Sequence, residues 1–237
     1  MATVDTTLFL ETAAESGEAV AYGVPITAYP TESGVIVVNS PGSGELKDGR
    51  ENRWKNLGGH FQESGFATLV TYNAPRPDFQ VQLETEPYSY RGASWNKLLM
   101  ESLSHTIDWA LENAAELCGH GSPAVYLSGF SSGGSAVGAV AHRYPCVERM
   151  LLLSTYDSVG DPFYEGVTAF KGRIHVVYGG DDPPAGMLVR VLEMGHLAAS
   201  SFQAREVPNC GHRFDGEDNT KRLTQAFHWA FNPDTSP

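Results

Sequence analysis

The chain has 237 residues, of which 41% are hydrophobic and 19% are charged, and its formal net charge at pH 7 is −12. This length allows one large domain with a sizeable core, and the composition excludes a disordered chain. The negative charge argues against a nucleic-acid partner and against binding to an anionic membrane surface.

The N-terminal segments predict a strand pair followed by two strands of a central sheet. Leu8–Thr12 and Val20–Tyr29 form the expected pair, with turn residues between them. Gly34–Asn39 and Ala67–Tyr72 are short apolar runs of the kind that is buried on both faces of a sheet. The stretch between these two runs predicts a helix from about Glu45 to Ser64.

A long loop is predicted next. Asn73–Gly92 contains three prolines and little periodicity, and a loop of this length in a compact domain is often functional. Ser94 is then placed to cap a long helix that runs to about Cys118, because the apolar residues from Trp95 to Leu111 keep helical spacing.

The remainder of the chain alternates strands with helices. The predicted strands are Ala124–Gly129, Met150–Tyr156, Ile174–Tyr178 and Phe202–Val207, and the predicted helices are Gly133–Arg143, Ala185–Leu197 and about Asn219 to Phe231. Repeated strand–helix units predict an α/β fold with a mostly parallel sheet and helices on both faces, as a single domain over residues 1–237. Reacting groups gather at the carboxyl ends of the strands in such sheets.

One pentapeptide lies at such a strand end. Gly129-Phe130-Ser131-Ser132-Gly133 matches G-x-S-x-G between a predicted strand and a predicted helix. Glycines at this spacing permit a sharp strand-to-helix turn that pushes the Ser131 side chain outward. A serine hydroxyl is a poor nucleophile at neutral pH and needs a base that an acid orients.

Two later strand ends carry an acid and a base. Gly179–Pro183 follows one strand and contains Asp181 and Asp182, and the other strand is followed by a turn that ends in His212. The order serine, aspartate, histidine, each after a strand of one sheet, is typical of a nucleophile, acid and base. Asp157, which follows another strand, is a further candidate for the acid.

With these motifs the chain resembles members of the α/β-hydrolase superfamily over nearly its full length. Gly129–Gly133 resembles the nucleophile elbow, Gly179–Pro183 the acid turn and Asn209–His212 the histidine turn. The resemblance implies the α/β-hydrolase fold, with Ser131 as nucleophile, His212 as base and Asp182, by its phasing, as acid. Cys210 has no glycine elbow, so a packed thiol is expected there.

The resemblance also implies an oxyanion hole, because the charge of a tetrahedral intermediate needs fixed donors. One donor would be the backbone N–H of Ser132. The second would come from the loop after the strand Gly34–Asn39, and phasing favours Ser43, with Gly42 or Gly44 as alternatives.

Contacts to substrate are predicted more loosely. Only Asp157–Arg173 separates two strands where relatives often insert a lid, so no large cap domain is expected. The long loop would then border the site, and the tentative substrate contacts are Tyr88, Tyr90, Trp95 and Tyr156. The lidless size resembles dienelactone hydrolases, but that branch uses a cysteine nucleophile.

These residues favour a carboxylic ester hydrolase or thioesterase that acts on a small-molecule acyl substrate. The alternatives are a biosynthetic acyltransferase or cyclase, a non-hydrolytic reaction such as that of a lyase or a pericyclic cyclase, and a binding module without activity. The other histidines show no metal-ligand spacing, so neither a metal nor a cofactor is predicted. The sequence does not indicate an oligomeric state.

The expected compartment is the cytoplasm. Three scattered cysteines, Cys118, Cys146 and Cys210, are typical of free thiols in a reducing environment. The first residues lack the pattern of a secretory signal, and no apolar run approaches the roughly 20 residues that span a bilayer.

Overall fold

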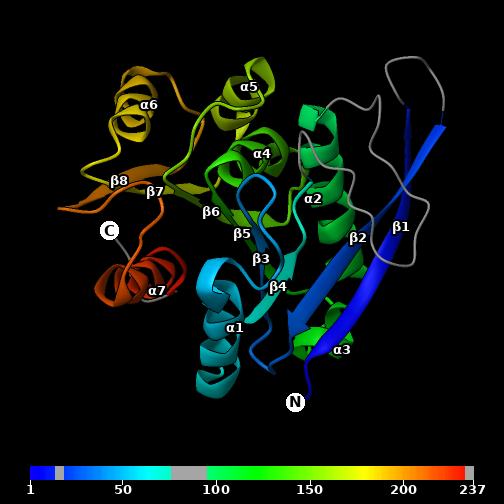
Figure 1. The fold of residues 1–237 in the computed structure, drawn as a ribbon. Helices are drawn as coiled ribbons and strands as arrows, with labels where there is room; N and C mark the ends of the chain where they lie inside the picture. The colour runs from blue at the N-terminus through cyan, green and yellow to red at the C-terminus, as the bar shows by residue number, and fades with distance from the viewer. Residues whose placement is uncertain (14–18, 76–94, 233–237) are drawn as a thin grey trace.

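The structure, a computed structural model, describes residues 1–13, 19–75 and 95–232. Its strands form one eight-stranded sheet in the order β1-β2-β4-β3-β5-β6-β7-β8 (Figure 1). The strands are β1 Val4–Ala13, β2 Ala19–Tyr29, β3 Val35–Ser40, β4 Thr68–Tyr72, β5 Ala124–Phe130, β6 Val147–Leu153, β7 Arg173–Gly179 and β8 Ser201–Val207. The pairs β1/β2 and β2/β4 are antiparallel, and every later pair in the sheet is parallel.

Helices cover both faces of the sheet (Figure 1). On one face lie α1 (Arg53–Ser64) and α7 (Glu217–Phe231), and on the other lie α2 (Trp95–Glu112), α4 (Ser132–Val140), α5 (Asp161–Ala169) and α6 (Pro183–Met194). The shorter helices are α3 (Ala114–Cys118) and the 3-10 turns η1 (Arg50–Asn52) and η2 (Ala141–Arg143). The expected α/β fold with helices on both faces is therefore confirmed.

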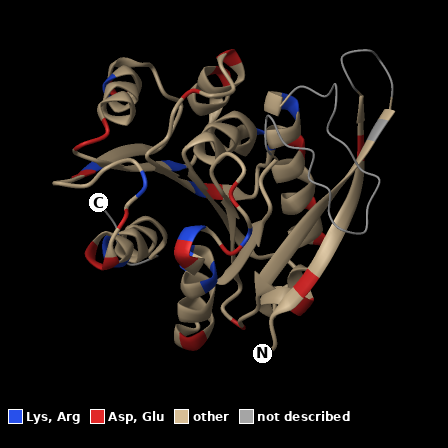
Figure 2. Cartoon of the chain, viewed as in Figure 1, with Lys and Arg blue, Asp and Glu red and all other residues tan. Residues whose placement is uncertain are grey.

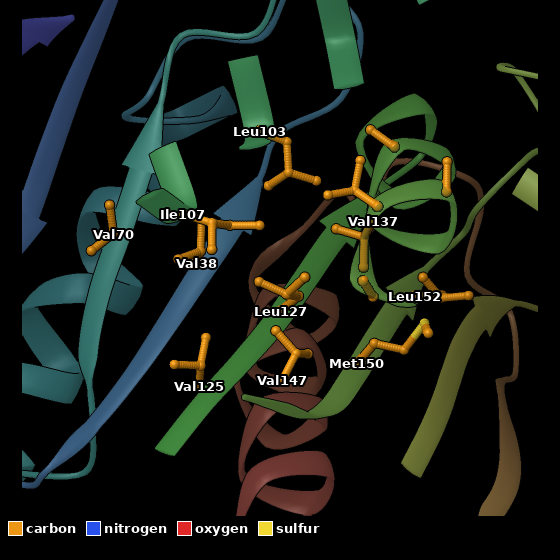
Figure 3. Packing of buried hydrophobic residues seen from close by; sticks show 14 of the residues in the cluster. Val38, Val70, Leu103, Ile107, Val125, Leu127, Val137, Val147, Met150 and Leu152 are labelled. Carbon is orange, nitrogen blue, oxygen red and sulfur yellow. The ribbon is translucent and has the colours of Figure 1, made fainter. Parts of the chain in front are cut away.

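The core is divided into two layers because successive side chains of a strand point to opposite faces. Val37 belongs to the layer under α1 and α7, with Phe61 and Phe227. Its neighbour Val38 belongs to the layer under α2 and α4, with Ile107, as Figure 3 shows from close by. This two-sided burial is the reason for the continuous β-branched run in β3.

Two of the predicted helices differ from the observed ones. The helix expected from about Glu45 begins only at Arg53, because Gly49, Glu51 and Asn52 all have positive φ and interrupt it. The helix expected to run to Cys118 ends at Glu112, and α3 follows as a separate short helix. Ser94, its expected cap, lies outside the described residues.

The segment between β6 and β7 contains a helix that the sequence reading missed. Helix α5 begins at Asp161 with a proline in its first turn, which is a common helix start. This single nine-residue helix is the only helix of residues 154–172, so no large cap domain is inserted there. None of the helices in the described ranges is long and apolar enough to cross a membrane.

Candidate active site

Ser131 lies at the turn between β5 and α4 in a strained conformation. Its φ of 55° and ψ of −121° belong to a region that residues with a Cβ atom rarely occupy. The backbone N–H of Ser131 donates to the carbonyl oxygen of Leu153 at 2.9 Å, which holds the turn against the end of β6. The turn therefore has the shape predicted from the pentapeptide.

The glycines that flank Ser131 are required by close backbone approach. A Cβ atom on Gly133 would lie 2.1 Å from the carbonyl oxygen of Ser40, and one on Gly129 would lie 2.5 Å from that of Gly133. Neither neighbour is a side chain that can swing away. Any larger residue at these positions would displace β3 or the first turn of α4.

Three side chains form a hydrogen-bonded chain at the carboxyl ends of β5, β7 and β8. The Nε2 atom of His212 lies 3.0 Å from the Oγ atom of Ser131, and its Nδ1 atom lies 2.8 Å from Oδ2 of Asp182. Asp182 is buried, whereas His212 is partly exposed. A partly exposed base between a hydroxyl and a buried carboxylate can take a proton from the hydroxyl.

Among the described residues, neither alternative acid has a hydrogen bond or ion pair with His212. Asp157 accepts a hydrogen bond from the Tyr164 hydroxyl at 2.8 Å, and the backbone of Asp181 bonds to Cys210. Burial raises the pKa of the Cys210 thiol, which keeps this side chain protonated. Of the three aspartates considered from the sequence, Asp182 is the one that the fold brings to the histidine.

The loop after β3 lies opposite the histidine. The N–H of Gly42 donates to Oε2 of Glu45 at 3.2 Å, and the N–H of Gly44 donates to the carbonyl oxygen of Pro75 at 3.3 Å. The N–H of Ser43 has no acceptor within the described ranges, and Ser43 lines the same cavity as Ser131. Of the three candidate donors in this loop, Ser43 is the one left available. Ser132 opens α4, where first-turn N–H groups have no intrahelical acceptor.

A buried ion pair supports this loop, and sequence reasoning did not find it. The guanidinium of Arg53 bonds to Oε1 of Glu45 at 2.7 Å and to the carbonyl oxygen of Arg213 at 2.9 Å. It also lies 4.2 Å from the centre of the Phe130 ring. Arg53 is only 8% exposed, and burial lowers its pKa while Glu45 acts in the opposite direction. One cation therefore touches the loop after β3, the elbow and the histidine loop.

Tyr156 and Trp95, two of the tentative substrate contacts, have their polar atoms bonded within the protein. The Tyr156 hydroxyl lies 2.9 Å from Oδ1 of Asp182 and 2.7 Å from Nδ1 of His212. The indole of Trp95 donates to the carbonyl oxygen of Pro75 at 3.2 Å. Tyr88 and Tyr90 lie outside the described residues, and substrate contact by all four stays a prediction.

A cavity of about 520 Å³ opens above Ser131 and His212. Its charged lining residues are Arg50, Arg53, Arg213 and Glu45. Figure 2 shows basic and acidic residues together at the start of α1, which borders this cavity. Three arginines and one glutamate therefore border the site, although the whole chain carries a formal charge of −12.

Comparison with known proteins identifies the fold. No protein-family model and no curated protein sequence matches the chain. Among solved structures, a dienelactone hydrolase from Anabaena variabilis superposes with a TM-score of 0.67 at 18% identity, covering 95% of this chain and 99% of that one. A serine hydrolase homologue from Coxiella burnetii gives 0.58 at 14% identity, with 92% and 94% covered, and an esterase domain from Rhodothermus marinus gives 0.57 at 12%, with 94% and 96% covered.

The chain has the α/β-hydrolase fold. The connection between β6 and β7, where the sequence predicted no large cap domain, holds α5 as its only helix. The turns that carry Ser131, Asp182 and His212 all lie at the carboxyl ends of strands of this sheet.

Arg53 and Glu45 are the site residues that the sequence reading missed. Both lie in the stretch expected to be one helix, where an eight-residue separation would not bring their side chains together. Gly49 and Asn52 between them were the available signal, since both are common where a helix is interrupted.

Proposed function

We propose that the protein is a serine hydrolase that cleaves an ester, thioester or lactone of a small to medium organic acid. The single observation that carries this proposal is the hydrogen-bonded chain from Ser131 through His212 to Asp182, on a strained turn at the mouth of a cavity. The solved structures with the same fold that are named as an esterase and a dienelactone hydrolase support this reading.

In the proposed mechanism, His212 takes the proton of Ser131 as the hydroxyl attacks the acyl carbon. The Asp182 carboxylate holds the imidazole with its hydrogen on Nδ1 and stabilises the imidazolium that forms. The N–H groups of Ser132 and Ser43 bind the oxyanion, which collapses to an acyl-enzyme as His212 protonates the leaving group. A water molecule, deprotonated by His212, then releases the acid and restores Ser131.

The test is labelling with a fluorophosphonate, followed by hydrolysis of 4-nitrophenyl esters of graded acyl length. We expect covalent labelling at Ser131 and a preference for short acyl groups. Ser131→Ala should abolish labelling and lower kcat by at least about 10³-fold, because no other group replaces the nucleophile. Ser64→Ala, which alters an exposed helix end, is the matched control and should behave like the wild type.

Other outcomes separate the alternatives. A wild-type protein that is not labelled and hydrolyses none of the esters would contradict the proposal and favour a non-hydrolytic reaction or a binding module. Labelling at Ser131 with a product that mass spectrometry identifies as a transferred or cyclised acyl group would favour an acyltransferase or cyclase.

The charges at the cavity mouth favour a substrate with an anionic group some distance from the acyl carbon. Glu45 neutralises Arg53, and Asp215 lies 3.4 Å from Arg50. Arg213 is exposed beside the base and has no ion pair within residues 1–13, 19–75 and 95–232. Its guanidinium is therefore the group available to a carboxylate on the substrate.

A matched pair of substrates tests this preference. 4-Nitrophenyl butyrate and the mono-4-nitrophenyl ester of succinic acid have similar chain lengths and differ by a carboxylate. We expect Arg213→Gln to lower kcat/KM for the succinate ester about 5-fold more than for the butyrate, since one exposed charge pair contributes at most roughly 1 kcal/mol. Arg190→Gln, at an exposed position on α6, should change neither value. Equal effects on both esters would contradict the preference.

A further inference from the structure

Tyr156 contacts the base and the acid of the site, and the mechanism above does not use it. The residue follows β6 and is not among the residues that line the cavity. Its ring stacks on the imidazole of His212, with centroids 4.6 Å apart and planes inclined by 13°. Its hydroxyl lies within hydrogen-bond distance of Asp182 Oδ1 and of His212 Nδ1. A side chain that touches both partners of the acid–base pair is placed to control it.

The single hydrogen of the Tyr156 hydroxyl has two possible acceptors. Donation to His212 Nδ1 would require the imidazole to carry its hydrogen on Nε2, and Nε2 could then not accept the Ser131 proton. Donation to Asp182 Oδ1 is a charge-assisted bond, which is the stronger of the two. The hydroxyl therefore points its hydrogen at the carboxylate.

The direction of the Tyr156 hydroxyl hydrogen determines which groups face Nδ1 of His212. With its hydrogen directed to Asp182, the Tyr156 oxygen presents only lone pairs to Nδ1, as Asp182 Oδ2 does on the other contact. Two acceptors at 2.7 and 2.8 Å both require a hydrogen on Nδ1. Burial and the nearby Asp182 carboxylate raise the pKa of the Tyr156 hydroxyl, so the hydroxyl keeps its hydrogen throughout the working pH range.

We infer that Tyr156 is a positioning residue that acts together with Asp182 to hold His212 in the Nδ1–H tautomer, with Nε2 free to accept the proton of Ser131. The stacked ring fixes the plane of the imidazole, and the hydroxyl oxygen is a second acceptor at Nδ1 beside Asp182 Oδ2. The catalytic consequence rests on the proposed function, because it requires Ser131 to be the nucleophile.

The experiment compares the wild type with Tyr156→Phe, which removes one oxygen atom and keeps the stacked ring. Nitrogen-15 NMR of labelled imidazole reports which ring nitrogen of His212 carries the hydrogen. We expect only the Nδ1–H form in the wild type and a smaller share of that form in the variant, where Asp182 alone selects it. We also expect kcat for a 4-nitrophenyl ester and the rate of fluorophosphonate labelling to fall together by about 10- to 100-fold, with KM within about twofold, as for other groups that orient a functional imidazole.

A matched control is Tyr164→Phe on α5, which removes the hydroxyl that donates to Asp157. This variant should leave the tautomer, kcat and labelling rate at wild-type values. The inference fails if the wild type shows the Nε2–H form, or if Tyr156→Phe keeps the wild-type tautomer and kcat. Failure of the proposed function has a different signature, because the wild type would then be neither labelled nor active while NMR still reports the tautomer.

Discussion

Two supports flank Ser131, and they differ in kind. On one side, a buried ion pair between Glu45 and Arg53 holds the loop that carries Ser43. On the other side, the neutral hydroxyl of Tyr156 touches the His212–Asp182 pair. Removing one member of a buried ion pair leaves a charge without its partner, whereas removing a hydroxyl removes only a dipole. The first support therefore couples the site to the stability of the whole fold, and the second affects mainly the chemistry.

The largest expected effect comes from breaking the ion pair. Arg53→Met leaves Glu45 nearly buried without its cation and frees the carbonyl oxygen of Arg213. We expect the free energy of unfolding to fall by about 3–5 kcal/mol, the usual cost of an unpaired buried charge. Urea denaturation measures this loss of unfolding free energy. The control is Arg190→Met, at an exposed position on α6, whose unfolding free energy should stay within about 0.5 kcal/mol of the wild type.

The double variant Arg53→Met with Glu45→Gln shows whether charge is the cause. Glutamine keeps an oxygen that can accept from Gly42 and from the indole of Trp54, but it carries no charge to bury. The double variant should recover part of the loss. A double variant that is less stable than Arg53→Met alone would show that the guanidinium acts by packing on Phe130 instead.

The pH dependence of stability is a second way to distinguish effects on the fold from effects on the site. Burial lowers the pKa of His175 to about 4, and the nearby arginines Arg149, Arg173 and Arg205 add to the effect. The unfolded chain takes up this proton near pH 6.5, so stability is lost as the pH falls from about 6.5 to 4. At about 1.4 kcal/mol per pKa unit, the loss of unfolding free energy is on the order of 3 kcal/mol.

His175→Phe should remove this acid sensitivity, because phenylalanine keeps a ring against Trp229 and takes up no proton. The free energy of unfolding, measured from pH 7 to 4, should fall less in this variant than in the wild type. His175 does not line the cavity, so activity near neutral pH should not change. Parallel stability curves for the two proteins would refute this account of His175.

The smallest expected effect on stability is that of Tyr156→Phe. The hydroxyl makes a bond to a charged group, and its loss should cost about 1–2 kcal/mol of unfolding free energy. Urea denaturation of Tyr156→Phe and of Arg53→Met, measured side by side, compares what the two supports contribute to the free energy of unfolding. A loss as large as that of Arg53→Met would remove the distinction drawn between them.

The sequence predicted the sheet, most of the helices and the three turns because these follow from short local patterns. Ser131, Asp182 and His212 each lie in the turn that follows an apolar run. These runs become parallel strands of one sheet, so their carboxyl ends bring the three side chains together. Tyr156 was included among the site residues, but its bonds to Asp182 and His212 depend on how β6 and β8 are placed across the sheet.

The ion pair could not be predicted in the same way. Glu45 and Arg53 meet only because the backbone turns at Gly49, Glu51 and Asn52, whose positive φ values are properties of the folded loop. The helix expected from about Glu45 to Ser64 was continued through that stretch, so the interruption was missed. Local patterns thus located the groups proposed to react, while the groups that support them depended on tertiary contacts.

The strained turn at Ser131 has a consequence for protein engineering. At φ 55° and ψ −121° a glycine would relax the backbone, and strain of this kind costs roughly 1–3 kcal/mol. A search for heat-resistant variants would therefore reward Ser131→Gly, the change that deletes the proposed nucleophile. Such a selection should therefore measure labelling of Ser131 by a covalent probe as well as the melting temperature, because the most stable variants would include ones that lack the serine.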